Sequence, residues 1–337
     1  MSTLSQKEAL ADSFAYCWEI LPHVSRTFAL TIPVLNEPLR TQVGVSYLLC
    51  RIADTVEDTV GLSGETRAEL FSSFRQLMRE PRDGSTRSRF QVKWPRQPDP
   101  HHQSLLEHTG TVLDCYSSFP QAVRDAIAHC VDEMVGGMSG YPNPAVREKP
   151  VEICTDLAAL EQYCHFVAGT VGILLSNLFA HELDARWMTP ERAEQGRRFG
   201  LGLQLTNVLK DHGSDRGRGV TYVPEQWTES SDAGVVLSRD GARILIDRAL
   251  EHLDVAQTYI LSIPPARSDM RLFCLWAAHL ALATLRIAAE GNHTAAKVDR
   301  EELWDVLERA RRDAGDDSAL QGIHAEYRAR VRAALAK

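Results

Sequence analysis

The chain has 337 residues, of which 44% are hydrophobic and 24% charged, and its net charge at pH 7 is −8. This balance excludes intrinsic disorder and collagen-like repeats. The acidic excess argues against nucleic acid as a partner, because nucleic-acid-binding domains usually carry a basic excess. Seven cysteines without a CxxC pair indicate reduced core residues, and the first residues lack the pattern of a secretory signal. We therefore expect a cytoplasmic protein.

Apolar residues recur at helical spacing along most of the chain, and no run of five or more residues alternates as a strand would. These patterns predict an all-α fold in a single domain spanning residues 1–337. The longest apolar stretch, Leu272–Leu285, is too short to cross a bilayer. It predicts a buried core helix and no transmembrane segment. In chain order, the expected helices are Gln6–Leu21, Glu37–Val60, Gly64–Arg79, His102–Ser117, Pro120–Met138, Asp156–His181, Thr189–His212, Ala233–Leu261, Arg267–Gly291 and Arg300–Leu335.

The segment 79–102 differs from the rest, because it is rich in proline and carries six basic residues between Arg79 and Arg96. With Phe90 and Trp94 interleaved, it has the composition of a segment that contacts a phosphate group or a membrane surface. The simpler interpretation is a basic, Pro-rich loop in solvent, and we prefer it, since long exposed loops gather charge without a function.

The first chemical signal lies inside the expected helix Glu37–Val60. Asp54, Glu57 and Asp58 are spaced i, i+3 and i+4, which places three carboxylates on one patch, and Tyr47 and Arg51 extend the polar line upstream. Mg²⁺ typically joins carboxylates to substrate phosphates. An acidic face in solvent has the same spacing and remains an alternative.

The second signal is Asn207, Asp211 and Asp215, spaced i, i+4 and i+8, which form a second polar stripe if the helix continues past Gly213. The preceding residues are small and apolar, so this helix should be buried. Two acidic stripes roughly 150 residues apart could together hold Mg²⁺ ions around a diphosphate. A buried network of aspartates with nearby cations would look the same in sequence, and the cations available to it are Arg51, Lys210, Arg216 and Arg218.

Two weaker signals complete the set. Ser25-Arg26-Thr27-Phe28 combines a hydroxyl and a guanidinium, which suits phosphate oxygens but also describes an ordinary surface pair. The segment Tyr163–Gly172 contains Gly169 and Gly172 inside an expected helix, where glycine costs about 1 kcal/mol relative to alanine. These glycines predict the close approach of another helix or of a ligand. Tyr163 itself could be an ordinary core residue.

Together and in this order, these segments resemble the squalene and phytoene synthase family over about Ser13–Gly291. Two segments lean toward the squalene synthase branch: Tyr163–Gly169, and the pair Phe273-Cys274 with Ala281–Leu285. The resemblance implies an isoprenoid-synthase-type helical bundle with a central apolar cavity. The motifs that carry it are Ser25–Phe28, Tyr47–Asp58, Asp132-Glu133-Met134 with Gly137-Met138, Tyr163–Gly172, Asn207–Asp215 and Tyr222-Val223-Pro224.

The reaction that the resemblance implies joins two farnesyl diphosphates head to head through presqualene diphosphate, with Mg²⁺, and then reduces the product to squalene with NADPH. The roles it implies are metal binding by Asp54, Asp58, Asp211 and Asp215, supported by Glu57 and Asn207. Tyr163 would steer a proton transfer, and Phe28 would face a cationic centre. The implied diphosphate and substrate contacts are Ser25, Arg26, Phe28, Tyr47, Arg51, Asn207, Lys210 and Arg218.

The second acidic motif departs from the family pattern. Ser214 stands where most members have an acid, Lys210 where arginine is common, and Val220 where arginine is frequent. A lysine cannot reproduce the bidentate fork of an arginine. These departures put in doubt the metal affinity of this motif.

Two other functions stay open. One is a dehydrosqualene- or phytoene-type synthase that needs no NADPH, because the chain has no GxGxxG fingerprint; Lys297 and Arg300 could hold a 2′-phosphate or be a random surface pair. The other is a catalytically inactive helical scaffold, which would have no reason to keep crowded carboxylates. Product release makes peripheral contact with a membrane a further expectation.

Overall fold

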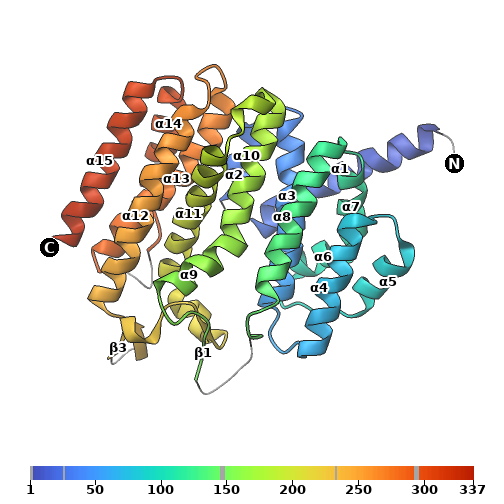
Figure 1. The fold of residues 1–337 in the computed structure, drawn as a ribbon, viewed down its shortest axis with the longest axis horizontal. Coiled ribbons are helices and arrows are strands. Elements are labelled where there is room, and N and C mark those ends of the chain that lie inside the picture. The colour runs from blue at the N-terminus through green and yellow to red at the C-terminus, as the bar shows by residue number, and fades with distance from the viewer. Residues whose placement is uncertain (1–2, 26, 145–148, 232–233, 292–295) are drawn as a thin grey trace. The chain divides into compact units, whose positions relative to one another are not determined.

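The structure is a computed structural model, and it describes residues 3–25, 27–144, 149–231, 234–291 and 296–337. The all-α prediction is confirmed (Figure 1). In the described ranges, strands are confined to two short pairs. By its internal contacts the chain divides into two compact units. The first comprises Met1–Pro144 and Asn177–Trp187, and the second comprises Ala145–Ser176 and Met188–Lys337.

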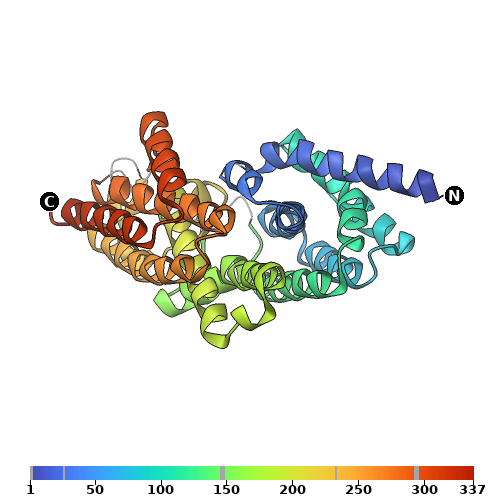
Figure 2. The same ribbon diagram turned by 90° about the horizontal axis from the view of Figure 1, so that it is seen from above.

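The first unit is built around α3, which packs against α1, α4, α7 and α8 and is seen nearly end-on in Figure 2. One face of α3 is fully apolar and buried, with Leu48, Leu49 and Ile52 at 0% exposure. The helices of this unit are α1 (Thr3–Val24), α2 (Phe28–Thr31), η1 (Ile32–Val34), α3 (Leu39–Asp58), α4 (Gly64–Arg79), α5 (Gly84–Val92), α6 (Pro100–Glu107), α7 (Thr109–Ser117) and α8 (Gln121–Met138).

The basic segment 79–102 is not a continuous loop, because Asp83 caps a nine-residue helix, α5. Phe90 is buried and stacks on Phe74 of α4, with ring centroids 5.5 Å apart, and Trp94 packs edge-on against Phe90. Both aromatic side chains therefore belong to the packing of the unit. This packing favours a structural segment over a membrane-binding one.

Three of the six basic side chains of the same segment form ion pairs with nearby acids. Arg79 pairs with Asp132 at 3.0 Å, Arg87 pairs with Asp114 at 2.8 Å, and Lys93 pairs with Glu69. These ion pairs reduce the net positive charge of the segment, which weakens its electrostatic attraction for anionic lipids.

The second unit is dominated by α11, which begins at the N-cap Thr189 and continues through Gly213 to Gly217. The condition for a second polar stripe is therefore met. The elements of this unit are β1 (Val151–Glu152), α9 (Leu157–Cys164), the π-helix η2 (His165–Gly169), α10 (Thr170–Leu183, whose last turns belong to the first unit), α11 (Pro190–Gly217), β2 (Val220–Thr221), η4 (Glu225–Trp227), β3 (Thr228–Ser231), β4 (Gly234–Leu237), α12 (Arg239–Ser262), α13 (Ser268–Ala289), α14 (Arg300–Asp313) and α15 (Asp317–Leu335), while η3 (Ala185–Trp187) lies in the first unit.

Three expected boundaries were wrong. The expected helix start at Ala233 lies outside the described residues, and residues 234–237 form a strand of a β3–β4 hairpin, so α12 begins only after the N-cap Ser238. The helix expected over Arg300–Leu335 is two helices, since Asp316 caps a new helix after Gly315. His102–Ser117 is likewise divided at His108 into α6 and α7.

Two helical segments are long and apolar enough to cross a membrane by length and composition alone, Leu157–Leu183 and Ser268–Ala289. In α13, 72% of the apolar window is buried inside the protein. This burial is the behaviour expected of a core helix, as predicted for Leu272–Leu285.

Candidate active site

The polar line on α3 is organised by hydrogen bonds. Tyr47 Oη donates to the carbonyl oxygen of Val24 at 3.0 Å and accepts from Arg51 Nη2 at 3.0 Å. Arg51 Nη1 lies 3.5 Å from Asp54 Oδ2. The side chains of Arg51 and Asp54 remain 28% and 27% exposed, although most of the helix is buried. The predicted stripe therefore exists as one connected, partly accessible line.

Asp54 has an unusual ionisation. Burial raises the pKa of its carboxyl group to about 6, although the Arg51 guanidinium opposes this rise, and the negative charge of Asp58 adds to it. A cation bound beside these carboxylates would favour the ionised form. Glu57, on the same helix, is only 6% exposed, whereas Asp54 and Asp58 are half-buried. Asp54 and Asp58 are thus the more accessible carboxylates of the three.

The segment before α2 meets this line at its upstream end. Ser25 Oγ accepts a hydrogen bond from Phe28 N at 3.1 Å, and the Phe28 and Tyr47 rings lie 5.4 Å apart at 43°. Arg26 lies outside the described residues. Ser25, Phe28 and Tyr47 are therefore brought together, as the sequence predicted.

His102 is a neighbour of the stripe that the sequence analysis missed. It stands in the first turn of α6, where Asp99 Oδ1 accepts from the backbone N–H of His101 and of His102 at 2.7 and 3.3 Å. Burial lowers the pKa of His102, and the charges of Arg51 and Asp58 also act on its ring. His102 of α6 thus adds a ring nitrogen near the α3 carboxylates. No local sequence pattern indicates this.

The solvent-accessible face of α11 carries Asn207, Lys210, Asp211 and Ser214. Lys210 Nζ lies 3.3 Å from Asn207 Oδ1 and 3.5 Å from Asp211 Oδ2. Ser214 Oγ donates to the carbonyl oxygen of Asp211 at 2.8 Å. Lys210 therefore neutralises part of the charge of this stripe.

Asp215 differs from Asp211 in its surroundings. Its side chain is only 8% exposed and accepts from Arg218 Nη2 at 2.7 Å. Such a pairing is what the buried Asp–Arg network predicts, and Arg218 occupies a carboxylate oxygen that a metal ion would otherwise use. Of the two acids, Asp211 is the more accessible.

Tyr163 lies in the last turn of α9, directly before the π-helix His165–Gly169, and is 4% exposed. Its ring stacks on that of Tyr222, with centroids 4.3 Å apart and planes at 25°. Local π-helical turns are often found at functional sites. The aromatic partner of Tyr163 comes from the segment after α11, which the sequence analysis included only as part of a motif.

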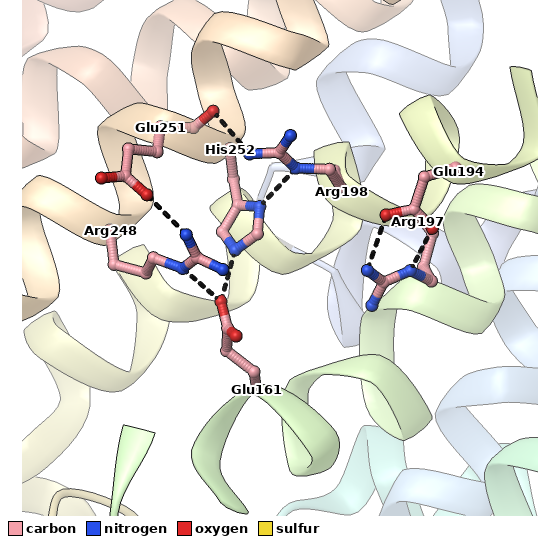
Figure 3. Close-up of polar contacts among 7 residues, drawn as sticks. All are labelled: Glu161, Glu194, Arg197, Arg198, Arg248, Glu251 and His252. Carbon is pink, nitrogen blue, oxygen red and sulfur yellow. Dashed lines mark hydrogen bonds and ion pairs between the residues drawn. The ribbon is translucent and has the colours of Figure 1, made fainter. Parts of the chain in front are cut away.

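Glu161, two residues before Tyr163, enters a network that joins three helices of the second unit (Figure 3). Glu161 Oε1 lies 2.7 Å from His252 Nε2 and accepts from Arg248 Nε at 2.5 Å, while His252 Nδ1 accepts from Arg198 Nε at 3.1 Å. Because Nδ1 accepts, the proton of neutral His252 is on Nε2. Burial raises the pKa of Glu161, but the hydrogen bonds from His252 and Arg248 outweigh it and bring the pKa to about 2.

The donor chemistry suits Mg²⁺. Among the described residues, no group of three or more His, Cys, Asp or Glu side chains could hold a metal ion alone. Mg²⁺, however, is commonly bound by one or two carboxylates together with substrate phosphates and water. The half-buried pair Asp54 and Asp58 meets that requirement.

The chain is similar to known proteins over most of its length. The family model described as squalene/phytoene synthase matches residues 21–306. The squalene synthase of Rattus norvegicus is 29% identical over 300 residues, which cover 85% of this chain and 66% of the rat protein. The chain thus spans slightly less than two thirds of that relative.

Solved structures share the fold. The complex of TcSQS with the ligand BPH1237 superposes with a TM-score of 0.76 at 24% identity, covering 96% of this chain and 92% of the other. A dehydrosqualene synthase in complex with a ligand gives a TM-score of 0.55 at 19% identity, covering 90% and 97%. Since the family match extends over most of the chain, the protein belongs to the squalene/phytoene synthase family.

Proposed function

We propose that the protein is a squalene synthase that joins two farnesyl diphosphates head to head through presqualene diphosphate and reduces this intermediate to squalene. The observation that carries the proposal is the connected line of Tyr47, Arg51 and Asp54 on α3. A phenol, a guanidinium and a carboxylate in one accessible row suit a diphosphate that arrives with a divalent cation. Family membership supports the same reaction class.

In the first unit, Arg51, Tyr47, Ser25 and Arg26 bind diphosphate oxygens, and Asp54 and Asp58, with Glu57 in support, hold Mg²⁺. When bound, Mg²⁺ neutralises the diphosphate as it leaves. The phenol of Tyr47 is already oriented by the Val24 carbonyl, so Arg51 is held in place before substrate arrives. Such preorganisation lowers the cost of charge stabilisation in the transition state.

In the second unit, Asp211 and Asn207 provide accessible oxygen ligands for a metal ion. Lys210 lies beside both side chains and binds the diphosphate. Asp215 and Arg218 form an ion pair. This pair would have to separate before Asp215 could bind a metal ion or Arg218 could bind a diphosphate. Phe28 presents an aromatic face to an allylic cation, an arrangement that stabilises positive charge.

Proton loss follows the attack of one alkene on the allylic cation of the other substrate. The electron pair of a C–H bond closes the cyclopropane ring, and the proton passes through the Tyr163 hydroxyl to the released diphosphate. When bound, NADPH supplies the hydride that replaces the second diphosphate. Lys297 and Arg300, both exposed at the start of α14, are the cationic side chains proposed for its 2′-phosphate.

Product analysis tests the function. Purified protein is incubated with farnesyl diphosphate, with and without Mg²⁺ and NADPH, and the products are separated by chromatography and mass spectrometry. We expect presqualene diphosphate with Mg²⁺ alone and squalene when NADPH is added. A dehydrosqualene- or phytoene-type product that is insensitive to NADPH would favour the reductant-free synthase, and no product of any kind would favour the inactive scaffold.

We also propose a cytoplasmic protein that contacts membranes only peripherally, when it releases its apolar product. Three of the six basic side chains of segment 79–102 are paired with acids, which reduces its attraction for anionic lipids, so contact should depend more on product than on lipid charge. Sedimentation with vesicles of neutral and of anionic lipid measures this. Strong binding to anionic vesicles alone would contradict the proposal.

A further inference from the structure

The stack of Tyr163 on Tyr222 joins two segments that are far apart in the sequence. Both rings are buried, at 4% and 6% exposure, and their planes are only 25° from parallel at a centroid separation of 4.3 Å. Offset aromatic stacks in this range are attractive and restrict ring rotation. The orientation of the Tyr163 phenol therefore depends on where the backbone holds Tyr222.

Tyr222 is held by a parallel strand pair. Val220 and Thr221 of β2 pair with Val151 and Glu152 of β1. The ladder includes hydrogen bonds from Val151 N to the Gly219 carbonyl at 2.9 Å and from Ile153 N to the Thr221 carbonyl at 2.8 Å. The position of the Tyr222 backbone is thus fixed on its N-terminal side, by a strand that leads into the same region of the chain as α9.

The segment after Tyr222 is anchored to the same partner. Thr221 Oγ1 donates to the Val223 carbonyl at 3.0 Å, and Glu225 N donates to Glu152 Oε1 at 2.7 Å. Gln226 Nε2 donates to the Thr155 carbonyl at 3.1 Å, immediately before the N-cap of α9. Tyr222 and Tyr163 therefore belong to two segments that are tied together on both sides of the stack.

The same segment also begins at the second acidic motif. The Arg218 N–H donates to the carbonyls of Ser214 and Asp215, and Gly219 then turns the chain with a φ of +84°, a conformation that favours glycine. Tyr222 follows Asp215 by seven positions along the chain. Tyr222 is thus joined to the acidic end of α11 by a short segment of chain and to Tyr163 by its ring stack.

We propose that Tyr222 is a positioning residue whose ring fixes the orientation of the Tyr163 phenol for the proton transfer that closes the cyclopropane ring. The inference rests on the proposed function. If the phenol is free to rotate, the cation reacts by other routes that also balance. Water can add its oxygen to the allylic cation and lose a proton to give farnesol, or the cation can lose a proton from a neighbouring carbon to give farnesene.

The test compares Tyr222→Leu with Tyr222→Phe. Leucine removes the aromatic face and keeps an apolar side chain, whereas phenylalanine keeps the stack and loses only the hydroxyl. We expect Tyr222→Leu to lower kcat for presqualene diphosphate formation roughly 10- to 100-fold with KM changed less than about 3-fold, since small misplacements at a reacting centre cost this much. The share of farnesol and farnesene should rise. Tyr222→Phe should stay within about 3-fold of wild type.

A double-mutant cycle separates positioning from a general structural effect. If Tyr222 acts through Tyr163, adding Tyr222→Leu to Tyr163→Phe should cause little further loss, because residues that act as one unit are not additive. Equal loss in both backgrounds would overturn the proposal, as would a Tyr222→Leu protein with wild-type kcat and products.

A matched control is Phe90→Leu, which removes another buried, stacked ring in the first unit. Its melting temperature should fall as much as that of Tyr222→Leu, with product ratios unchanged. If wild type makes no prenyl product, the proposed function fails, but crystal structures of wild type and Tyr222→Leu still decide the inference. An unchanged Tyr163 ring in the variant would overturn it.

Discussion

Asp54 and Asp58 are the residues of α3 on which the proposed chemistry depends most directly. Asp54→Ala or Asp58→Ala should reduce presqualene diphosphate formation by at least about 100-fold, because the departing diphosphate would lose part of its charge stabilisation. The measurement is the rate of the first half-reaction at saturating Mg²⁺. Asp114→Ala, which removes an exposed carboxylate paired with Arg87, is the control and should leave the rate unchanged. A near wild-type rate in either α3 variant would contradict the metal role.

The spacing of residues along a helix explains which site residues could be predicted from the sequence. Tyr47, Arg51 and Asp54 repeat at helical intervals, so one helix brings them together whatever surrounds it. His102 and Tyr222 reach their partners from other elements, and no local pattern encodes such meetings. The pairing of Asp215 with Arg218 was foreseen only as one of two alternatives.

Glycine residues permit α11 to pack closely against η2 and α10. A Cβ atom on Gly200 would collide with the backbone carbonyl of Ala168, and one on Gly172 would collide with that of Gly196. Gly169 also lies against α11, where a Cβ atom would be 2.9 Å from Leu201 Cδ1, so both glycines that were expected to admit a helix or a ligand admit a helix. Backbone atoms cannot move aside as flexible side chains do, so the positions of Gly172 and Gly200 are strict.

Gly200→Ala should therefore destabilise the protein by about 3 kcal/mol or more, at the upper end of the usual range for overpacking. Gly213→Ala is the matched control in the same helix, because nothing lies within 4 Å of a Cβ atom there. It should stabilise by up to about 1 kcal/mol through helix propensity. Urea-unfolding midpoints of the two variants should move in opposite directions. A shift in the same direction would show that the close contact is not limiting.

Element boundaries were predictable where capping and periodicity agreed. The range Gly64–Arg79 matches α4, whose N-cap Ser63 accepts from Thr66 N. Prediction failed where weak local signals were decided by packing. In α5, for example, Phe90 stacks on Phe74 of α4, although prolines and charged residues flank it in the sequence. The β3–β4 hairpin is short and mostly exposed, so its residues carry no alternating apolar pattern.

At the scale of the whole molecule, each compact unit carries one acidic helix, α3 in the first and α11 in the second. The sequence identified both helices because each stripe is local. A central apolar cavity, by contrast, depends on contacts across the chain that spacing does not encode, and it stays a prediction. The core of the second unit also contains polar side chains at positions where the helical pattern predicts apolar ones.

His279 is the clearest of these groups. It lies on α13 at 0% exposure, and among the described residues neither ring nitrogen has a hydrogen-bond partner. Tyr327 packs against the ring at 5.3 Å. Burial lowers the pKa of His279 to about 3, and the charges of His324 and Arg309 act in the same direction. Its position in an apolar run explains why the sequence predicted only a core helix.

This histidine should make the whole molecule sensitive to acid. In the unfolded chain it binds a proton below about pH 6.5, whereas in the folded protein it resists protonation until about pH 3. The unfolded state therefore binds more protons across this window, so the free energy of unfolding falls as the pH falls from 6.5 toward 3. His279→Phe keeps an aromatic ring without ionisable nitrogens and should flatten that decline. His129→Gln, at a side chain that is 74% exposed, is the control and should follow wild type. Urea midpoints at pH 7, 5.5 and 4 measure the effect, and parallel declines in His279→Phe and wild type would show that other groups govern the acid response.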